Sequence, residues 1–248
     1  MSIYNVYRGG VKTIDSIINV YSAIDARWSD ISLVEQELFL FNKVIQSGIP
    51  YSRIHLISGQ DMPIKSNDEI HDFFNKHIDV EFIEASFQPR FIKRIKYYHF
   101  FVRKRRQSFI YEFLRRVLLV VQICIGVNRI RNLDLKLEFG SEWCSLTLGA
   151  VKYIADNYPK YRKNFEYTTA SDELYKQMLL KSAEDKFAIS PMGNLRFIIF
   201  KDNHPSPEIL SEKDYDAIIN SNCMFARKFD YVKCPTIVDM ILNYIKKQ

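Results

Sequence analysis

The sequence lacks an apolar stretch long enough to cross a lipid bilayer. Its longest apolar run, residues 117–127, is interrupted by Gln122 and Gly126 and falls short of the roughly 20 residues that a membrane-spanning helix needs. The first residues also lack the charged segment, apolar core and small-residue cleavage site of a secretory signal. These absences predict a cytoplasmic chain, and a composition of 47% hydrophobic and 26% charged residues is typical of a globular one.

Cysteine is scarce and is not spaced for metal binding. There is no Cys-x-x-Cys pair and no histidine at zinc-finger spacing from the four cysteines, which are Cys124, Cys144, Cys223 and Cys234. Isolated thiols in an intracellular chain are most simply reduced core residues. The five histidines are too scattered to predict a catalytic triad or a metal site.

Acidic residues are absent from one strongly basic segment. Residues 90–106 hold eight Lys or Arg residues and no acid, in a chain of net charge +6. Aromatic and apolar side chains interleave with cations over residues 100–116, as a helix on an anionic membrane surface would require. The apolar residues are Phe100, Phe101, Phe109 and Leu114, and the cations are Arg103, Lys104, Arg105, Arg106, Arg115 and Arg116. An ordinary solvated helix face is the alternative. No helix-turn-helix, RNP or zinc pattern accompanies the charge, so nucleic acid is not an expected partner.

Hydrophobic periodicity and capping signals predict alternating helices and strands. Helices are expected over residues 32–45, 67–76, 149–157 and 171–181, and over the basic segment through residue 127. Strands are expected over residues 54–58, 80–83, 133–139 and 196–200. Ser32 is predicted to cap the first helix, with Glu35 completing a capping box. This alternation predicts one α/β domain over residues 1–248.

Four short blocks carry the residues with chemical potential. They are LISGQDMPIKSN at residues 56–67, GSEWCSLT at 140–147, SDE at 171–173 and MFARKFD at 224–230, preceded by a weaker RWS at 27–29. In this order and spacing they resemble the motifs of the core-2/I-branching β-1,6-N-acetylglucosaminyltransferases and their xylosyltransferase relatives. The resemblance covers nearly the whole chain after residue 27.

The resemblance implies a GT-A-like fold, with a mixed central sheet flanked by helices, and an inverting sugar transfer from a UDP-sugar. The family's catalytic base corresponds to Glu173, because it is the last residue of the SDE block; Asp172 is expected only to favour a helix start. Arg227 and Lys228 correspond to cations that hold the donor diphosphate. Contacts to donor or acceptor sugars are expected from Asp61, Gln60, Trp143, Glu84 and Arg94.

No metal or other cofactor is expected. A metal-dependent transferase of this architecture holds its cation with an Asp-x-Asp at a strand end, because hard cations prefer oxygen ligands. The only such string joins Asp214 and Asp216, in a polar segment typical of an exposed helix. Without a metal, fixed cations must neutralise the departing diphosphate, which is the role given to Arg227 and Lys228.

The chain departs from the family at its beginning. Neither the family's first strand nor its second one near the uridine pocket is found before Trp28, although residues 17–21 are a candidate remnant strand. We therefore expect an N-terminal nucleotide-binding strand that is missing or divergent. The expected acceptor is a glycan or glycolipid, in a bacterial-type enzyme peripheral to the inner face of the plasma membrane. The alternatives are a xylosyltransferase-like enzyme and a non-catalytic protein that binds anionic membrane or glycan surfaces.

Overall fold

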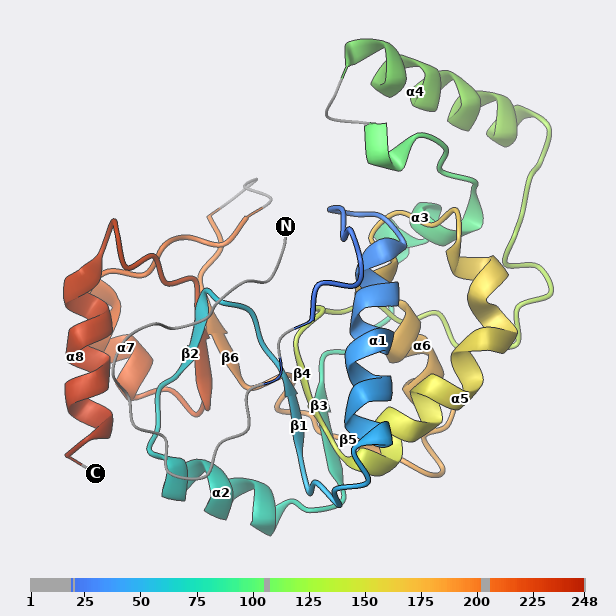
Figure 1. Ribbon diagram of the computed structural model, residues 1–248. Helices are drawn as coiled ribbons and strands as arrows, with labels where there is room; N and C mark the ends of the chain where they lie inside the picture. The colour runs from blue at the N-terminus through green and yellow to red at the C-terminus, as the bar shows by residue number, and fades with distance from the viewer. Residues whose placement is uncertain (1–18, 20, 105–107, 202–205, 248) are drawn as a thin grey trace. The chain divides into compact units, whose positions relative to one another are not determined.

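The computed structural model describes residues 19, 21–104, 108–201 and 206–247. The chain forms two compact units, each built from three separate stretches of sequence (Figure 1). Unit 1 comprises residues 1–50, 85–142 and 149–184, and unit 2 comprises residues 51–84, 143–148 and 185–248. The remnant strand proposed near residues 17–21 falls largely outside the described residues. The expectation of one catalytic domain over residues 1–248 stays a prediction.

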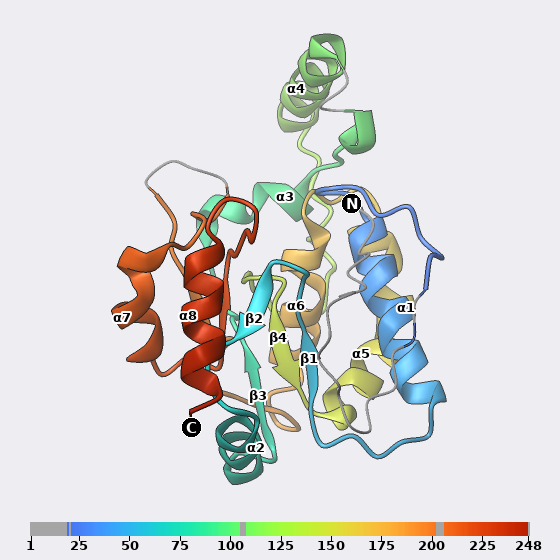
Figure 2. The same cartoon turned by 60° about the vertical axis from the view of Figure 1, so that its left-hand side comes forward.

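The regular elements described in unit 1 are helices. They are α1 (Ser32–Gln46), η1 (Pro89–Phe91), α3 (Lys93–Lys96), η2 (Val102–Lys104), α4 (Phe109–Cys124), α5 (Leu148–Phe165), η3 (Ser171–Glu173) and α6 (Tyr175–Lys181). Figures 1 and 2 show α1, α5 and α6 side by side, with α4 apart from them. In the part of the chain that the structure describes, no helix is long and apolar enough to cross a membrane.

An aromatic cluster and a buried ion pair hold unit 1 together. Tyr158 and Phe165 of α5 pack on Tyr175 of α6, with ring centroids 5.6 Å apart for Tyr158 and 6.4 Å for Phe165. Lys176 lies 2.6 Å from Glu37 Oε2, and the Tyr175 hydroxyl donates to the same oxygen at 2.7 Å. Burial raises the pKa of Glu37 to about 7, against the opposing charge of Lys176. These contacts attach α6 to α1.

Unit 2 contains two small mixed sheets. A four-stranded sheet has the order β1-β4-β3-β5, where β1 is Ile54–Leu56, β3 Val80–Ile83, β4 Cys144–Leu146 and β5 Ala188–Ile189. A three-stranded sheet has the order β2-β7-β6, where β2 is Asp61–Pro63, β6 Arg196–Ile198 and β7 Phe225–Arg227. Among the described strands, the β3–β5 and β6–β7 pairs are parallel and the others are antiparallel. The mixed α/β class predicted from the sequence is confirmed, but the strands form two sheets.

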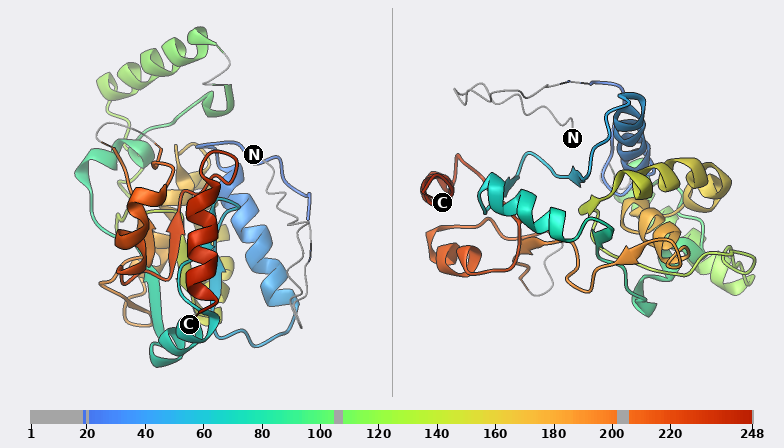
Figure 3. Two further views of the ribbon diagram at one scale, coloured as in Figure 1. Left: turned by 90° about the vertical axis from the view of Figure 1, so that its left-hand side faces the viewer. Right: turned by 90° about the horizontal axis from the view of Figure 1, so that it is seen from below.

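Helices α2 (Asn67–Lys76), α7 (Tyr215–Ile219) and α8 (Pro235–Ile245), with η4 (Glu212–Asp214), complete unit 2. Helix α8 buries Ile237, Val238 and Ile241 in a core shared with Ala226 of β7. It runs beside α7 (Figure 3). The rings of Tyr215 and Tyr244 meet edge to face between the two helices. This core supports the strand that carries the candidate cations.

Three predicted elements differ from the structure. Residues 133–139 form no strand; Leu135 and Phe139 are buried as the alternation requires, but only an isolated bridge joins Phe139 to Ser86, and the Lys136 amide donates to the Ser182 hydroxyl. The basic segment is not one helix: η1, α3 and η2 precede α4. The helix expected over residues 171–181 is split into η3 and α6.

Two local predictions were also wrong. Ser32 does not cap α1, because it lies inside the helix, where its hydroxyl accepts the Arg27 amide; the capping box is instead at Ser66 of α2. All four cysteines are free, but only Cys144 is buried, and Cys124 is exposed on α4. The helix over residues 67–76 and the strand over residues 80–83 are confirmed with their predicted bounds.

Candidate functional site

The short helix η3 displays the predicted base. It follows Ala170, which takes a left-handed conformation (φ 52°) that is uncommon for a residue with a side chain. The Ala170 amide donates to Ser29, and the buried Ser171 hydroxyl donates to backbone carbonyls at the end of α5. Backbone conformations of this kind are concentrated at functional sites. The turn leaves the Glu173 side chain 40% exposed.

Two residues predicted separately meet at this turn. The Arg94 guanidinium donates to Glu173 Oε2 in a short ion pair, and it stacks 4.0 Å from the centroid of the Phe91 ring. The Glu173 carbonyl also accepts the Gly140 amide at 3.1 Å, within the GSEWCSLT block. Phe91 in turn packs on Phe139. Glu173 is therefore held by contacts at both its backbone and its side chain.

The sequence did not identify the environment of Asp172. The residue is buried, in contrast to the expected role at an exposed helix start, and η3 is only three residues long. Burial, with the carboxyls of Glu142 and Glu173 adding to it, raises the pKa of Asp172 well above its usual range. The sequence shows that Asp172 and Glu173 are adjacent, but adjacency does not indicate whether either side chain is buried.

In unit 2, the turn after β1 positions Asp61. The Asp61 carboxylate accepts the Ser58 amide at 2.6 Å, and the Asp61 amide donates back to the Ser58 carbonyl. The Gln60 amide donates to the Ser58 hydroxyl, and the Gln60 carbonyl accepts the Phe229 amide at 2.9 Å. This turn therefore joins the LISGQD block to the FARKFD block.

Asp61, Arg227 and Trp143 form a second cluster of predicted residues. Strands β2 and β7 pair so that Asp61 lies opposite Arg227, and Arg227 Nε is 3.3 Å from Asp61 Oδ1. The guanidinium lies 4.2 Å from the centroid of the Trp143 ring, a cation–π contact. Burial raises the pKa of Asp61, although the charge of Arg227 opposes that rise. Both charged side chains are almost completely enclosed.

Lys228 and Glu84 are more exposed than the enclosed side chains of Asp61 and Arg227. The Lys228 carbonyl accepts the Leu210 amide, while its side chain is half-buried and forms no ion pair with the described residues. Glu84 is exposed and directly follows β3. Thus Lys228 is the more accessible of the two predicted diphosphate cations.

A buried arginine that the sequence did not single out holds the strands in place. Arg196 donates to the Cys144 carbonyl at 2.7 Å, the Ser145 hydroxyl at 2.8 Å and the Leu56 carbonyl at 3.2 Å. It thereby ties β6 to β4 and β1. Burial lowers the pKa of Arg196 to about 10. The Arg-Phe dipeptide at the start of the predicted strand was visible, but the partners of the guanidinium were not.

Among the described residues, no group of three or more His, Cys, Asp or Glu side chains has the arrangement of a metal site. Asp214 and Asp216 lie in η4 and α7, where Asp214 accepts the Ser211 amide in a capping box. Asp214 is therefore engaged in capping the start of η4.

The chain is a mixed α/β protein in which one unit carries the partly exposed carboxylate of Glu173, and the other carries Arg227 at the end of β7 and Lys228 directly after it. The sequence model of the core-2/I-branching enzyme family matches residues 11–218, so the chain belongs to this family. The family consists of glycosyltransferases, and the chain is therefore a glycosyltransferase. No curated protein matches it in sequence.

Proposed function

We propose that the protein is an inverting glycosyltransferase that moves N-acetylglucosamine, or another sugar, from a UDP-sugar to a hydroxyl of a glycan or glycolipid. The observation that supports this most is Glu173, because it occupies the position of the family's base and is held half-exposed by Arg94. Membership of the family supports the coarser statement, that a sugar is transferred.

In the proposed reaction Glu173 is the general base. It takes the proton of the acceptor hydroxyl while that oxygen attacks the anomeric carbon from the face opposite the leaving group. The bond between the anomeric carbon and the UDP oxygen breaks, and its electron pair leaves with UDP. One carboxylate is sufficient for this single displacement. Arg94 orients the base through the ion pair, and it also remains a proposed contact to a sugar.

The departing diphosphate requires positive charge. We assign this role to Lys228 and Arg227, with Lys228 in direct contact because Arg227 is enclosed between Asp61 and Trp143. Preorganised cations stabilise charge that develops in a transition state more than they stabilise the ground state. Gln60, Asp61, Trp143 and Glu84 remain proposed contacts to donor or acceptor sugars. The proposed reaction uses no metal, and full turnover in EDTA is its test.

The decisive experiment compares Glu173→Gln with Lys228→Ala, using release of UDP from candidate UDP-sugars. Glu173→Gln keeps size but removes the proton acceptor, so we expect turnover to fall by roughly 10²–10⁴-fold with unchanged UDP affinity. Lys228→Ala should weaken UDP binding as well as turnover, because a cation contacts the diphosphate in both ground and transition states.

Glu212→Gln is the matched control, because Glu212 is an exposed carboxylate of η4. It should leave turnover and UDP affinity unchanged. Near-normal turnover in Glu173→Gln, or a loss of UDP affinity equal to that of Lys228→Ala, would show that Glu173 is not the base. Transfer of xylose in preference to N-acetylglucosamine would favour the xylosyltransferase-like alternative. Absence of turnover with every donor would favour the non-catalytic one.

A further inference from the structure

Helix α4 has its polar side facing inward. Gln122 is buried and makes two hydrogen bonds with the backbone of Tyr98: its carbonyl accepts the Tyr98 amide at 2.7 Å, and its amide donates to the Tyr98 carbonyl at 3.0 Å. Arg115 and Glu112 form an ion pair at 2.8 Å, and both are mostly shielded from solvent. A surface helix of a globular protein normally shows the opposite arrangement.

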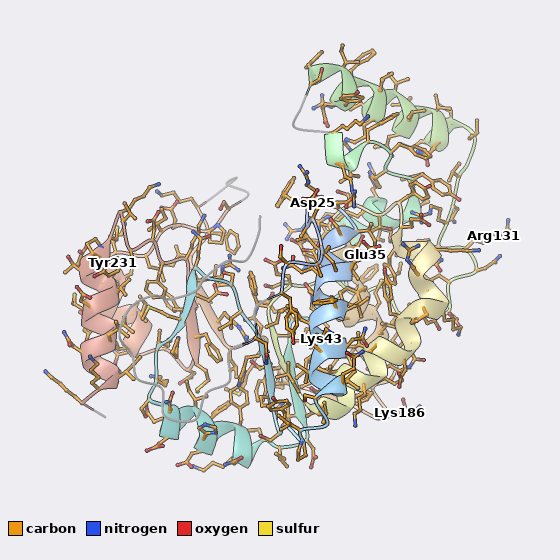
Figure 4. The ribbon with its side chains drawn as sticks, viewed as in Figure 1. Asp25, Glu35, Lys43, Arg131, Lys186 and Tyr231 are labelled. Carbon is orange, nitrogen blue, oxygen red and sulfur yellow. The ribbon has the colours of Figure 1, made fainter. Side chains whose placement is uncertain are left out.

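The other side of α4 is apolar and exposed. Six side chains form what we call the outer face: Phe109, Ile110, Phe113, Val117, Val120 and Val121. At 100° per residue they fall within an arc of about 120°, on the side of the helix away from Gln122. Phe109 is 82% exposed. Figures 1 and 3 show α4 apart from α1, α5 and α6, and Figure 4 shows side chains along its length. No described element of unit 1 covers this face.

The surroundings of the outer face are positively charged. Residues 90–131 contain twelve Lys or Arg residues and a single acid, Glu112. That acid is neutralised by Arg115 and Arg116. Arg116 is 73% exposed at the rim of the outer face, and Lys104 lies over the ring of Tyr111 near the start of the helix.

We propose that the outer face of α4 inserts into the interfacial region of an anionic membrane, with the helix lying in the membrane plane. An apolar helix face flanked by cations is the usual structure of such a contact, since the lipid tails accept the apolar side chains and the anionic headgroups attract the cations. The 16 residues of α4 span about 24 Å, less than the roughly 30 Å of a bilayer core.

A second copy of the chain is a poorer occupant. In a symmetric dimer the same surface is used by both copies, so the cations around one outer face would meet those around the other. Anionic lipid complements this charge, whereas the chain itself carries a net charge of +6. The proposal does not depend on the reaction: a chain without any turnover could still bind a membrane.

The test is flotation of the full chain with vesicles of phosphatidylglycerol and phosphatidylcholine, and with vesicles of phosphatidylcholine alone. We expect binding to the anionic vesicles only, weakened when ionic strength rises from about 0.1 M to about 1 M, because the Debye length falls from about 10 Å to about 3 Å. The double variant Phe113→Glu/Val120→Glu should lower partitioning at least tenfold. The matched control is Tyr231→Glu/Val232→Glu, two exposed apolar residues of unit 2, which should partition normally.

A second measurement keeps the proposal falsifiable if the double variant does not fold. Val120→Trp places a fluorophore on the outer face, and its emission should shift to shorter wavelength with anionic vesicles, whereas Val232→Trp should not shift. Sedimentation should give a monomer. Absence of vesicle binding at low salt, equal partitioning of the two double variants, or a dimer that dissociates in Phe113→Glu/Val120→Glu would overturn the proposal, and the last result would assign the face to a second copy.

Discussion

At the scale of single residues, the ion pair of Arg94 and Glu173 is the contact with the clearest consequence for activity. Arg94 stacks on Phe91 and reaches Glu173, whereas Arg90 stacks on the same ring, 4.6 Å from its centroid, and bonds only to Gln88 among the described residues. The two arginines therefore share the aromatic contact and differ in the carboxylate. This makes Arg90 the control for Arg94.

Arg94→Ala should reduce kcat by about tenfold to a hundredfold, because a base displaced by about 1 Å loses its alignment with the acceptor hydroxyl. The KM for the UDP-sugar should stay the same, and the melting temperature should change no more than in Arg90→Ala. Arg90→Ala should keep normal kcat. Equal loss of kcat in both variants would mean that packing on Phe91, and not orientation of Glu173, explains the effect.

His55 provides a prediction about pH and stability. It is half-buried and packs on the rings of Phe74 and Phe225, with Nδ1 2.8 Å from the Ser145 hydroxyl. Burial, with the nearby charges of Arg196 and Arg53, lowers the pKa of His55 from 6.5 to about 3. Between these values the unfolded chain binds a proton that the folded chain does not. The free energy of unfolding should therefore fall as pH is lowered through this window, by up to about 1.4 kcal/mol per pH unit from this residue.

Replacing His55 by Asn removes the titrating group, so the pH dependence between 6.5 and about 3 should become shallower. Urea unfolding at a series of pH values measures this slope. The control is His71→Asn, since His71 is exposed on α2. An unchanged slope in the His55 variant would show that this histidine is accessible to protons in the folded state.

The sequence motifs indicated the candidate site residues but not the contacts between them. The sequence indicated Asp61 and Arg227 as separate candidates; their ion pair depends on the register of β2 with β7, which only the folded chain determines. Likewise, Arg94 was assigned to an acceptor sugar, because nothing in the local sequence reports that it reaches Glu173. The burial of Asp172 could not be predicted either, because local sequence does not report the contacts that form on folding.

At the scale of elements, α2 was predicted correctly because its signals are local. Ser66 accepts the Glu69 amide at 3.3 Å, and the Glu69 carboxylate accepts the Ser66 amide at 3.0 Å. Strands β2, β4 and β7 were missed, whereas β1 and β6, which are equally short, lie within longer apolar runs of the sequence. The strand prediction for residues 133–139 was wrong. Alternating apolar residues indicate that one side of a segment is buried, but they do not indicate that a neighbouring strand pairs with it.

The cap of α2 can be tested directly. Ser66→Ala removes one acceptor of the capping box and should lower the free energy of unfolding by about 1 kcal/mol. Ser52→Ala is the control, because Ser52 is exposed in the loop before β1, and it should change stability by less than about 0.5 kcal/mol. Urea unfolding monitored by circular dichroism measures both. A loss no larger than that of the control would mean that α2 is held by its packing alone.

At the scale of the whole molecule, the sequence predicted the α/β class and the family, but not the division into two units. The chain passes between the units five times, as its alternating stretches show. Such interleaving leaves no Pro-rich or Gly-rich linker of the kind that marks a boundary in a sequence. The order of helices and strands is readable from local patterns, while their grouping depends on contacts between distant stretches.

The place of β4 has a consequence for how the protein is made. Residues 143–148 are the only part of the middle of the chain that belongs to unit 2, and they supply the strand that separates β1 from β3. On the ribosome, β1 and β3 therefore emerge before the strand that joins them. Unit 1 needs nothing beyond residue 184, whereas unit 2 needs residues from 185 onward. A nascent chain can thus complete its helical unit first, while the early strands of the other unit still have unpaired edges, which are prone to aggregation.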